Sequence, residues 1–257
     1  QVAALSAKAV TGLTATQVGA LSTDQVGALT TGQIAALNDK QLGALGADDI
    51  AELSTDAIGA ISGKSIGGLS TDAVAALSED QVGALTTGQI AGLKASQVAA
   101  LTTDQIGYLS TDQVGALTAA QVGALTTDQI GALTTDQIGA LSAKAVTGLT
   151  AAQVGALSTD QVGALTTGQI GALNDKQLGA LGADDIAELS IDAVTAISTK
   201  AISGLSTDAV AALSEDQIGA LSNGQVAALS GKQVAALTTD QVGHRTAGEV
   251  GALRTTQ

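Results

Sequence analysis

The fold is decided by one octad, which recurs along the chain without insertion or deletion: Thr134-Thr135-Asp136-Gln137-Ile138-Gly139-Ala140-Leu141. We label its positions a to h. Position e is Val, Ile or Leu from Val2 to Val250, and position h is Leu or Ile from Leu5 to Leu253, with Arg245 the exception. The structure of the whole chain should therefore follow from the local structure of one octad and from how successive octads pack.

Each octad carries the signals that start a helix. Position a is nearly always Ser or Thr and position d is mostly Gln, with Asp49, Asp185 and Glu249 among the variants. A hydroxyl followed three residues later by Gln or Glu is a capping box, in which each side chain bonds the other residue's backbone N–H. Leu before the cap and Val or Ile at the fourth helical position form a hydrophobic staple. We therefore expect one short helix per octad.

A single continuous helix does not fit this repeat. At about 100° per residue, eight residues rotate the apolar stripe by about 80° per octad, so the stripe would circle the helix. A β-solenoid is the alternative, but strands need apolar residues two apart and positions e and h are three apart. Helices this short are unstable alone, so they must stack on one another. The sequence predicts an all-α solenoid of short capped helices.

The number of octads per superhelical turn follows from position c, which we expect to face outward. Acidic residues there come in clusters, at Asp24, Asp48 with Asp56, Asp72 with Asp80, Asp104 with Asp112, Asp128 with Asp136, Asp160, Asp184 with Asp192, Asp208 with Asp216, and Asp240. The intervals hold small residues or lysines: Lys8, Lys40, Lys64, Lys144, Lys176, Lys200 and Lys232. From the mean spacing of the clusters we predict about 3.4 octads (27 residues) per turn, with an acidic ridge opposite a lysine-bearing side.

The unbroken repeat predicts a single array over residues 1–257 with no linker. The array contains a duplication with an offset of seventeen octads, because Ala36–Ser54 and Ala172–Ser190 are identical. The octads degrade over residues 242–257, where His244 and Arg245 replace apolar or small residues, and we expect this end to cap the array. The chain starts with Gln1 in mid-octad, so we expect it to be part of a longer protein.

Composition excludes several classes of function. The net charge of −14 opposes binding to nucleic acid and to anionic membranes. No run approaches the roughly 18 apolar residues of a membrane span. The chain has no Cys and a single His, His244, so a catalytic base or thiolate metal site is not expected. Tyr108 stands at a position that is mostly Ala, which indicates partial exposure.

The octad Leu133-Thr134-Thr135-Asp136-Gln137-Ile138-Gly139-Ala140 resembles the octapeptide tracts of very large bacterial exoproteins labelled as adhesins or haem-utilisation proteins. The resemblance covers the whole chain and implies export and a structural or surface role. It implies no haem site here, because Met and Cys are absent and His244 stands alone. A likeness to the DNA-binding repeats of plant-pathogen effectors is rejected, because those repeats are longer and basic.

Two binding functions remain as alternatives. The acidic ridge offers oxygen ligands for a divalent cation such as Ca²⁺, at Asp48, Asp49, Glu52 and Asp56 and at their duplicates Asp184, Asp185, Glu188 and Asp192. A solvated acidic face that keeps the protein soluble explains the same residues. Stacked Thr at positions a and b could bind ice, although Asp39, Glu79 and Ile191 interrupt that array.

We therefore expect a non-enzymatic rod, stalk or fibre-forming region of a secreted or surface bacterial protein. It needs no cofactor. The expected partners are further copies of the chain or other surface components, without nucleic acid and without membrane insertion of this segment.

Overall fold

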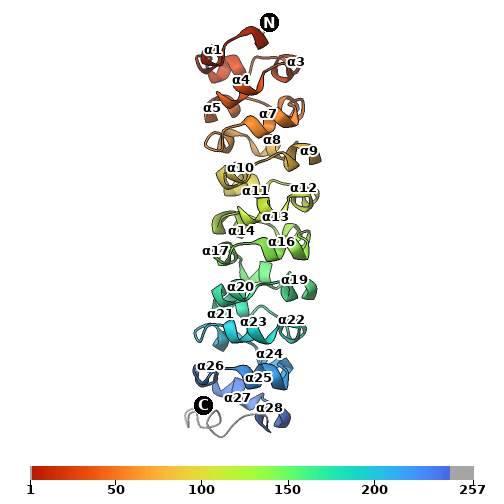
Figure 1. Cartoon of the computed structure of the whole chain (residues 1–257), viewed down its shortest axis with the longest axis vertical. Coiled ribbons are helices and arrows are strands. Elements are labelled where there is room, and N and C mark those ends of the chain that lie inside the picture. Colours follow the sequence, from red (N-terminus) through yellow and green to blue (C-terminus); the bar gives the residue numbers. More distant parts are fainter. Residues whose placement is uncertain (1, 244–257) are drawn as a thin grey trace. The chain divides into compact units, whose positions relative to one another are not determined.

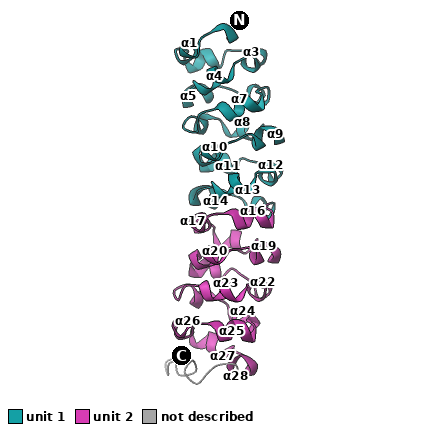
Figure 2. Ribbon diagram, viewed as in Figure 1, with its two compact units in different colours: residues 1–132 teal, residues 133–257 magenta. Residues whose placement is uncertain are grey.

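A computed structural model describes residues 2–243. Over that range the chain forms 28 α-helices and three 3₁₀ helices and contains no strand. The α-helices are four to six residues long, one in nearly every octad. The predicted helical solenoid is confirmed, and the β-solenoid alternative is wrong for the described residues. The chain divides into two compact units, residues 1–132 and 133–257 (Figure 2).

The first unit holds two of the 3₁₀ helices and fifteen of the α-helices. Their bounds are η1 Val2–Ala4, α1 Ala7–Thr11, α2 Ala15–Val18, α3 Thr23–Gly27, α4 Thr31–Ala35, α5 Asp39–Leu42, α6 Ala47–Ala51, α7 Thr55–Ala60, η2 Ile66–Gly68, α8 Thr71–Ala75, α9 Glu79–Gly83, α10 Thr87–Gly92, α11 Ala95–Ala99, α12 Thr103–Tyr108, α13 Thr111–Gly115, α14 Ala119–Ala124 and α15 Thr127–Gly131.

The second unit repeats this arrangement up to the last described residue. Its helices are α16 Thr135–Ala140, α17 Ala143–Val146, α18 Ala151–Val154, α19 Thr159–Gly163, α20 Thr167–Ala172, α21 Asp175–Leu178, α22 Ala183–Glu188, α23 Ile191–Ala196, η3 Ile202–Gly204, α24 Thr207–Ala212, α25 Glu215–Ala220, α26 Asn223–Ala228, α27 Gly231–Ala235 and α28 Thr239–Gly243. The degraded repeats predicted at the end of the chain, with His244 and Arg245, lie outside the described residues from position 244 onward.

The capping boxes form as the sequence predicts. Thr134 is extended, with φ −72° and ψ 163°, and its hydroxyl accepts a hydrogen bond from the Gln137 backbone N–H. The Gln137 side-chain oxygen in turn accepts the Thr134 backbone N–H at 2.7 Å. Each helix start with a complete capping box thereby satisfies two backbone donors that would otherwise lack partners. Lys94 begins α11 without a side-chain cap, so the fold tolerates an incomplete start.

Within each unit, helices three octads apart stack on one another. Thus α4 packs on α7 and α11 on α14 in the first unit, and α20 packs on α23 in the second. One edge of the first unit in Figure 1 carries α3, α7, α9 and α12. The starts of these four helices are separated in turn by four, three and three octads. The predicted winding of between three and four octads per turn is confirmed.

The core is a column of aliphatic side chains from positions e and h. Ile106 and Val114 are fully buried, and Leu109 is buried beside them. Their burial removes apolar surface from water at about 25 cal/mol per Å², which stabilises helices too short to persist alone. Within residues 2–243 no residue has a positive φ, so none of the described glycines is required by a left-handed backbone.

Glycine at position f allows close approach at some octads and not at others. A Cβ added at Gly43 would lie 2.7 Å from the Gly68 carbonyl oxygen, and one at Gly179 would lie 2.6 Å from the Gly204 carbonyl oxygen. At Gly83, Gly107 and Gly131 an added Cβ would meet nothing within 4 Å. Glycine at position f therefore serves close packing only in those octads where the turns approach each other that closely.

Candidate functional site

The glutamine at position d links each turn to the one before it. The Gln105 side-chain oxygen accepts the Thr102 backbone N–H at 2.8 Å, which completes the capping box of α12. Its amide Nε2 donates to the Leu77 carbonyl at 2.7 Å and to the Val74 carbonyl at 3.1 Å, which lie 28 and 31 residues earlier. We call this arrangement a glutamine clasp, since one carboxamide joins its own helix start to the preceding turn.

The clasp recurs through both units. Donors to two carbonyls at these same offsets are Gln33, Gln41, Gln81, Gln89, Gln97, Gln105, Gln113, Gln121, Gln129, Gln169, Gln177, Gln217, Gln225, Gln233 and Gln241. All of them are buried. A buried carboxamide without partners would be strongly destabilising, so the clasp fixes how one turn sits on the next.

The sequence predicted only the capping half of this role. The residues at positions a and d indicated a capping box, which Glu at position d would serve equally well. The missed signal is that Gln, and not Glu, fills this position wherever a clasp forms. A carboxylate offers no donor for the two carbonyls, so the preference for Gln indicates a second partner that needs an N–H.

The glutamines at the start of the first unit confirm the division of roles. Gln17 and Gln25 lie in α2 and α3 and are exposed. Their side-chain oxygens accept the Thr14 and Ser22 backbone N–H groups, as the capping box requires. A clasp needs carbonyls 28 and 31 residues earlier in the chain, and no described residue lies that far before Gln17 or Gln25. Their side chains therefore act as caps alone.

Each unit contains four consecutive octads without glutamine at position d. We call them glutamine-free bands: residues 46–77 carry Asp49, Ala57, Ser65 and Ala73, and residues 182–213 carry Asp185, Ala193, Ala201 and Ala209. Each band includes an octad whose α-helix is replaced by a 3₁₀ helix, η2 or η3. The repeat did not predict these 3₁₀ helices, because the apolar positions are unchanged there.

The acidic candidates for cation binding lie within or beside these bands. Asp49 accepts the Gly46 backbone N–H at 2.9 Å and Asp185 accepts the Gly182 N–H at 2.8 Å, so both carboxylates act as helix caps. The other candidates are exposed: Asp48, Glu52, Asp56, Asp184, Glu188 and Asp192. Between residues 2 and 243 no group of three or more His, Cys, Asp or Glu could hold a metal ion. Cation binding at this surface stays an untested expectation.

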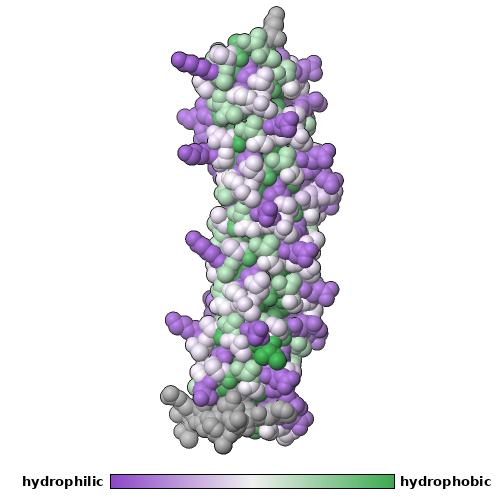
Figure 3. Space-filling model, in the orientation of Figure 1, coloured by the Kyte–Doolittle hydropathy of each residue, from purple (hydrophilic) through white to green (hydrophobic). Residues whose placement is uncertain are grey.

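The c positions separate charge onto opposite edges of each unit. In the first unit of Figure 1, one edge carries α3, α7, α9 and α12, whose c positions are Asp24, Asp56, Asp80 and Asp104, and the other carries α1, α5, α10 and α14, whose c positions are Lys8, Lys40, Gly88 and Ala120. In the second, one edge carries α16, α19 and α22, whose c positions are Asp136, Asp160 and Asp184, and the other carries α17 and α21, whose c positions are Lys144 and Lys176. Hydrophilic side chains project along both edges in Figure 3. These helices agree with the predicted acidic ridge and lysine-bearing side, and the ridge as a whole, which also includes Asp48, Asp72, Asp112 and Asp128, stays a prediction.

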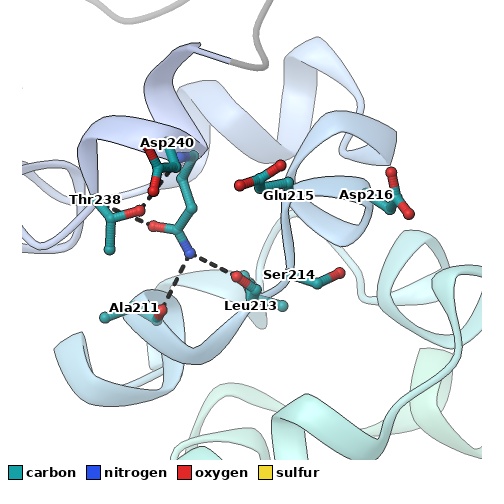
Figure 4. Close-up of a pocket in the computed structure, with 8 residues that line it drawn as sticks. Ala211, Leu213, Ser214, Glu215, Asp216, Thr238 and Asp240 are labelled. Atoms are coloured by element: carbon teal, nitrogen blue, oxygen red, sulfur yellow. Dashed lines mark hydrogen bonds between the residues drawn. The ribbon is translucent and has the colours of Figure 1, made fainter.

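A hollow lies on the surface beside α28. It measures about 470 Å³ and is lined by Ala211, Leu213, Ser214, Glu215, Asp216, Thr238, Asp240 and Gln241 (Figure 4). Gln241 clasps the Leu213 and Val210 carbonyls at its base. The described part of the chain contains no His or Cys that could activate the hydroxyls. Its repeat-only helical fold is typical of a structural protein.

Two further expectations concern single residues and membranes. Tyr108 is 44 % exposed, as predicted. Among residues 2–243, none of the helices combines the length and the apolar character that a membrane span requires.

Comparison with known proteins identifies the repeat. A family model described as the ALTTAQ repeat matches residues 1–31, 27–55, 55–87, 86–119, 115–143, 135–167, 194–223 and 219–247. Each match is about as long as the distance that a clasp spans along the chain, so one family unit corresponds to one turn. The family description names neither adhesion nor haem. No curated protein matches the chain.

Proposed function

The chain belongs to the ALTTAQ repeat family, and from this we propose that it serves as a structural spacer, a stack of clasped turns that holds other parts of a larger protein apart. The observation that carries this proposal is the glutamine clasp. Because each clasp is formed between a turn and its predecessor, turns can be added without altering those already present. A spacer needs this property, since its length is set by the number of repeats.

The surface supports the same function. The described residues expose mainly small side chains, hydroxyls and carboxylates, with large exposed apolar side chains limited to Leu5, Tyr108, Ile191 and Val242. A net charge of −14 favours hydration of this surface. Such a surface suits a region that crosses aqueous space as a stalk.

We extend the proposal to location and assembly. The resemblance of the octad to the repeats of bacterial exoproteins supports a stalk on a cell surface or in a secreted protein. Opposite acidic and lysine-bearing edges would allow copies to align side by side into a fibre, or to contact other surface components.

Small-angle X-ray scattering of the full chain tests the spacer proposal. Nine turns stacked at about 8–10 Å each predict a particle roughly 75–90 Å long, with a radius of gyration of about 25 Å. A compact protein of this size would give about 18 Å. A value near the compact one contradicts the proposal.

A matched deletion sharpens this test. Removing residues 6–141 joins Leu5 to Ser142 without breaking the octad, because Ser6 and Ser142 occupy equivalent positions. The shortened chain should retain a helical circular dichroism spectrum, and its maximum dimension should fall to about half. A shortened chain that unfolds, or that keeps the original dimension, would show that length does not follow repeat number.

A further inference from the structure

The glutamine-free bands interrupt the series of clasps over a complete turn. One clasp reaches back 28 residues to the preceding turn, and each band contains four octads, or 32 residues. Elsewhere in residues 2–243, glutamine is missing from position d in single octads only, at Ala9 and Ala145. Four octads is the smallest whole number that exceeds one turn. Only the bands therefore leave an entire boundary between two turns without a clasp.

No protein donor replaces glutamine at the carbonyls opposite the bands. At the offset of 28 residues these carbonyls belong to Leu21, Leu29, Leu37 and Leu45 in the first unit and to Leu157, Leu165, Leu173 and Leu181 in the second. Among the described residues, none of the eight accepts a hydrogen bond from the protein. In clasped octads, by contrast, the Leu85 and Leu93 carbonyls accept the side chains of Gln113 and Gln121 at 2.7 and 2.9 Å.

Close packing does not compensate for this loss. A Cβ added at Gly68, within the first band, would collide with the Asp39 carbonyl. One added at Gly92 would collide with the Gly63 carbonyl, across a boundary that Gln89 clasps. The aliphatic residues at positions e and h are also of the same types in the bands as elsewhere. A boundary in a band thus has the packing of a clasped boundary without its hydrogen bonds, each of which would add to stability.

We propose that each band is a seam, a boundary at which two adjacent turns of one unit separate before clasped turns do. The turns across the first seam are residues 18–45 and 46–77, and those across the second are residues 154–181 and 182–213. Opening either seam breaks no clasp, so the seams lie at the low end of the local stabilities along the chain. In a spacer, the function proposed above, a seam lets the stalk lengthen under tension at a defined place.

The natural chain contains a matched pair of segments for the test. Residues 80–90 and 160–170 are identical in sequence, and in both of them two glutamines clasp the preceding turn. The Leu85 carbonyl of the first segment also accepts Gln113 from the following turn. The equivalent Leu165 carbonyl of the second segment faces a seam and accepts no such bond. The two segments therefore differ in whether the boundary to the following turn is clasped.

Hydrogen exchange of the full chain, followed by mass spectrometry, measures opening in the two segments. Peptides that extend to Glu79 or Thr159 differ in mass, so the two copies are resolved. Their intrinsic exchange rates are equal, because the sequences are identical. Since each missing hydrogen bond changes an opening equilibrium several-fold, residues 160–170 should exchange about tenfold faster or more. Equal exchange, or slower exchange in residues 160–170, would overturn the proposal.

A variant with a new seam tests the cause. The four clasps that reach Leu77, Leu85, Leu93 and Leu101 are removed together by Gln105→Ala, Gln113→Ala, Gln121→Ala and Gln129→Ala. Exchange in residues 80–90 should then rise to the rate of residues 160–170. A control without Gln129→Ala keeps one clasp in that turn and should show a smaller rise. A folded fourfold variant with unchanged exchange would overturn the proposal, and if it does not fold, the natural pair of segments decides.

Lengthening under tension rests on the spacer function and is tested separately. When the full chain is held by its two ends in an optical trap, two early steps should appear at lower force than the remaining unfolding. A single cooperative rupture would overturn this mechanical part. A compact particle in X-ray scattering would instead contradict the spacer, while the difference in hydrogen exchange would still report the seams. The two failures are therefore distinguishable.

Discussion

Residues 78–101 and residues 46–77 are neighbouring stretches of one unit that hold their turns together in different ways. In the first stretch, Gln81, Gln89 and Gln97 clasp the preceding turn. In the second, Asp49, Ala57, Ser65 and Ala73 stand at the same position and no glutamine clasp forms. Backbones approach closely in both stretches, since a Cβ at Gly68 would collide with the Asp39 carbonyl and one at Gly92 with the Gly63 carbonyl.

The comparison shows that the octad combines two separable functions. The aliphatic column is the same in both stretches, because positions e and h are Val, Ile or Leu throughout. Only the link between turns differs, because the buried carboxamide with three partners is absent from the second stretch. The solenoid therefore tolerates loss of the clasp over four consecutive octads.

The largest effect on stability is expected from replacing the carboxamide of one clasp with a carboxylate, which has no N–H to donate. Gln105→Glu keeps an acceptor for Thr102 but buries a carboxylate against the Leu77 and Val74 carbonyls. It should reduce the free energy of unfolding by about 3 kcal/mol or more, measured by urea unfolding followed by circular dichroism. Gln25→Glu is the control, because Gln25 is exposed and only caps. Equal losses at both sites would contradict the clasp.

A smaller effect of opposite sign is expected from adding a clasp to the glutamine-free band. Asp49→Gln should keep the bond to the Gly46 N–H and reach the Leu21 and Val18 carbonyls, at the offsets found in the other clasps. The gain should be about 1 kcal/mol, seen as a higher melting temperature. Asp49→Asn is the matched control, since its amide is too short to reach. The prediction is wrong if the two variants melt alike.

The helix caps should contribute similarly in different clasped octads. Ser110→Ala removes a hydroxyl that accepts the Gln113 N–H and should cost about 1 kcal/mol. Lys94→Thr supplies the cap that α11 lacks and should stabilise by a similar amount. Thermal unfolding of the two variants measures both. No change in either would show that packing alone sets the helix starts.

The smallest effect is expected at the exposed acidic edge. Asp104→Asn removes a carboxylate from the first turn of α12, where it complements the positive helix end. The loss should stay within about 0.5 kcal/mol and should shrink as salt is added. A larger loss that persists in high salt would give this residue a structural role that its exposure does not suggest.

The parts of the fold that were predictable depend on signals inside one octad or on a long repeat. Ser or Thr, Gln and two aliphatic residues determine each helix start and its buried face. The recurrence of Asp at position c predicted the number of octads per turn, because side chains such as Asp24 and Asp56 face solvent and recur along one edge.

The unpredicted parts depend on residues that meet only after winding. The partner of Gln105 lies 28 residues away at Leu77, a distance that no local pattern indicates. The η2 and η3 helices likewise reflect packing of Gly68 and Gly204 against earlier turns.

The direction of the clasp has a consequence for synthesis. Each glutamine donates only to carbonyls that precede it, so an octad leaving the ribosome already has its partners in the chain. Bonds that span about 28 of 257 residues correspond to a relative contact order near 0.1, typical of fast-folding helical proteins. At about 5–20 residues per second, folding can keep pace with translation. The solenoid is then assembled in the order in which it is made, one octad at a time.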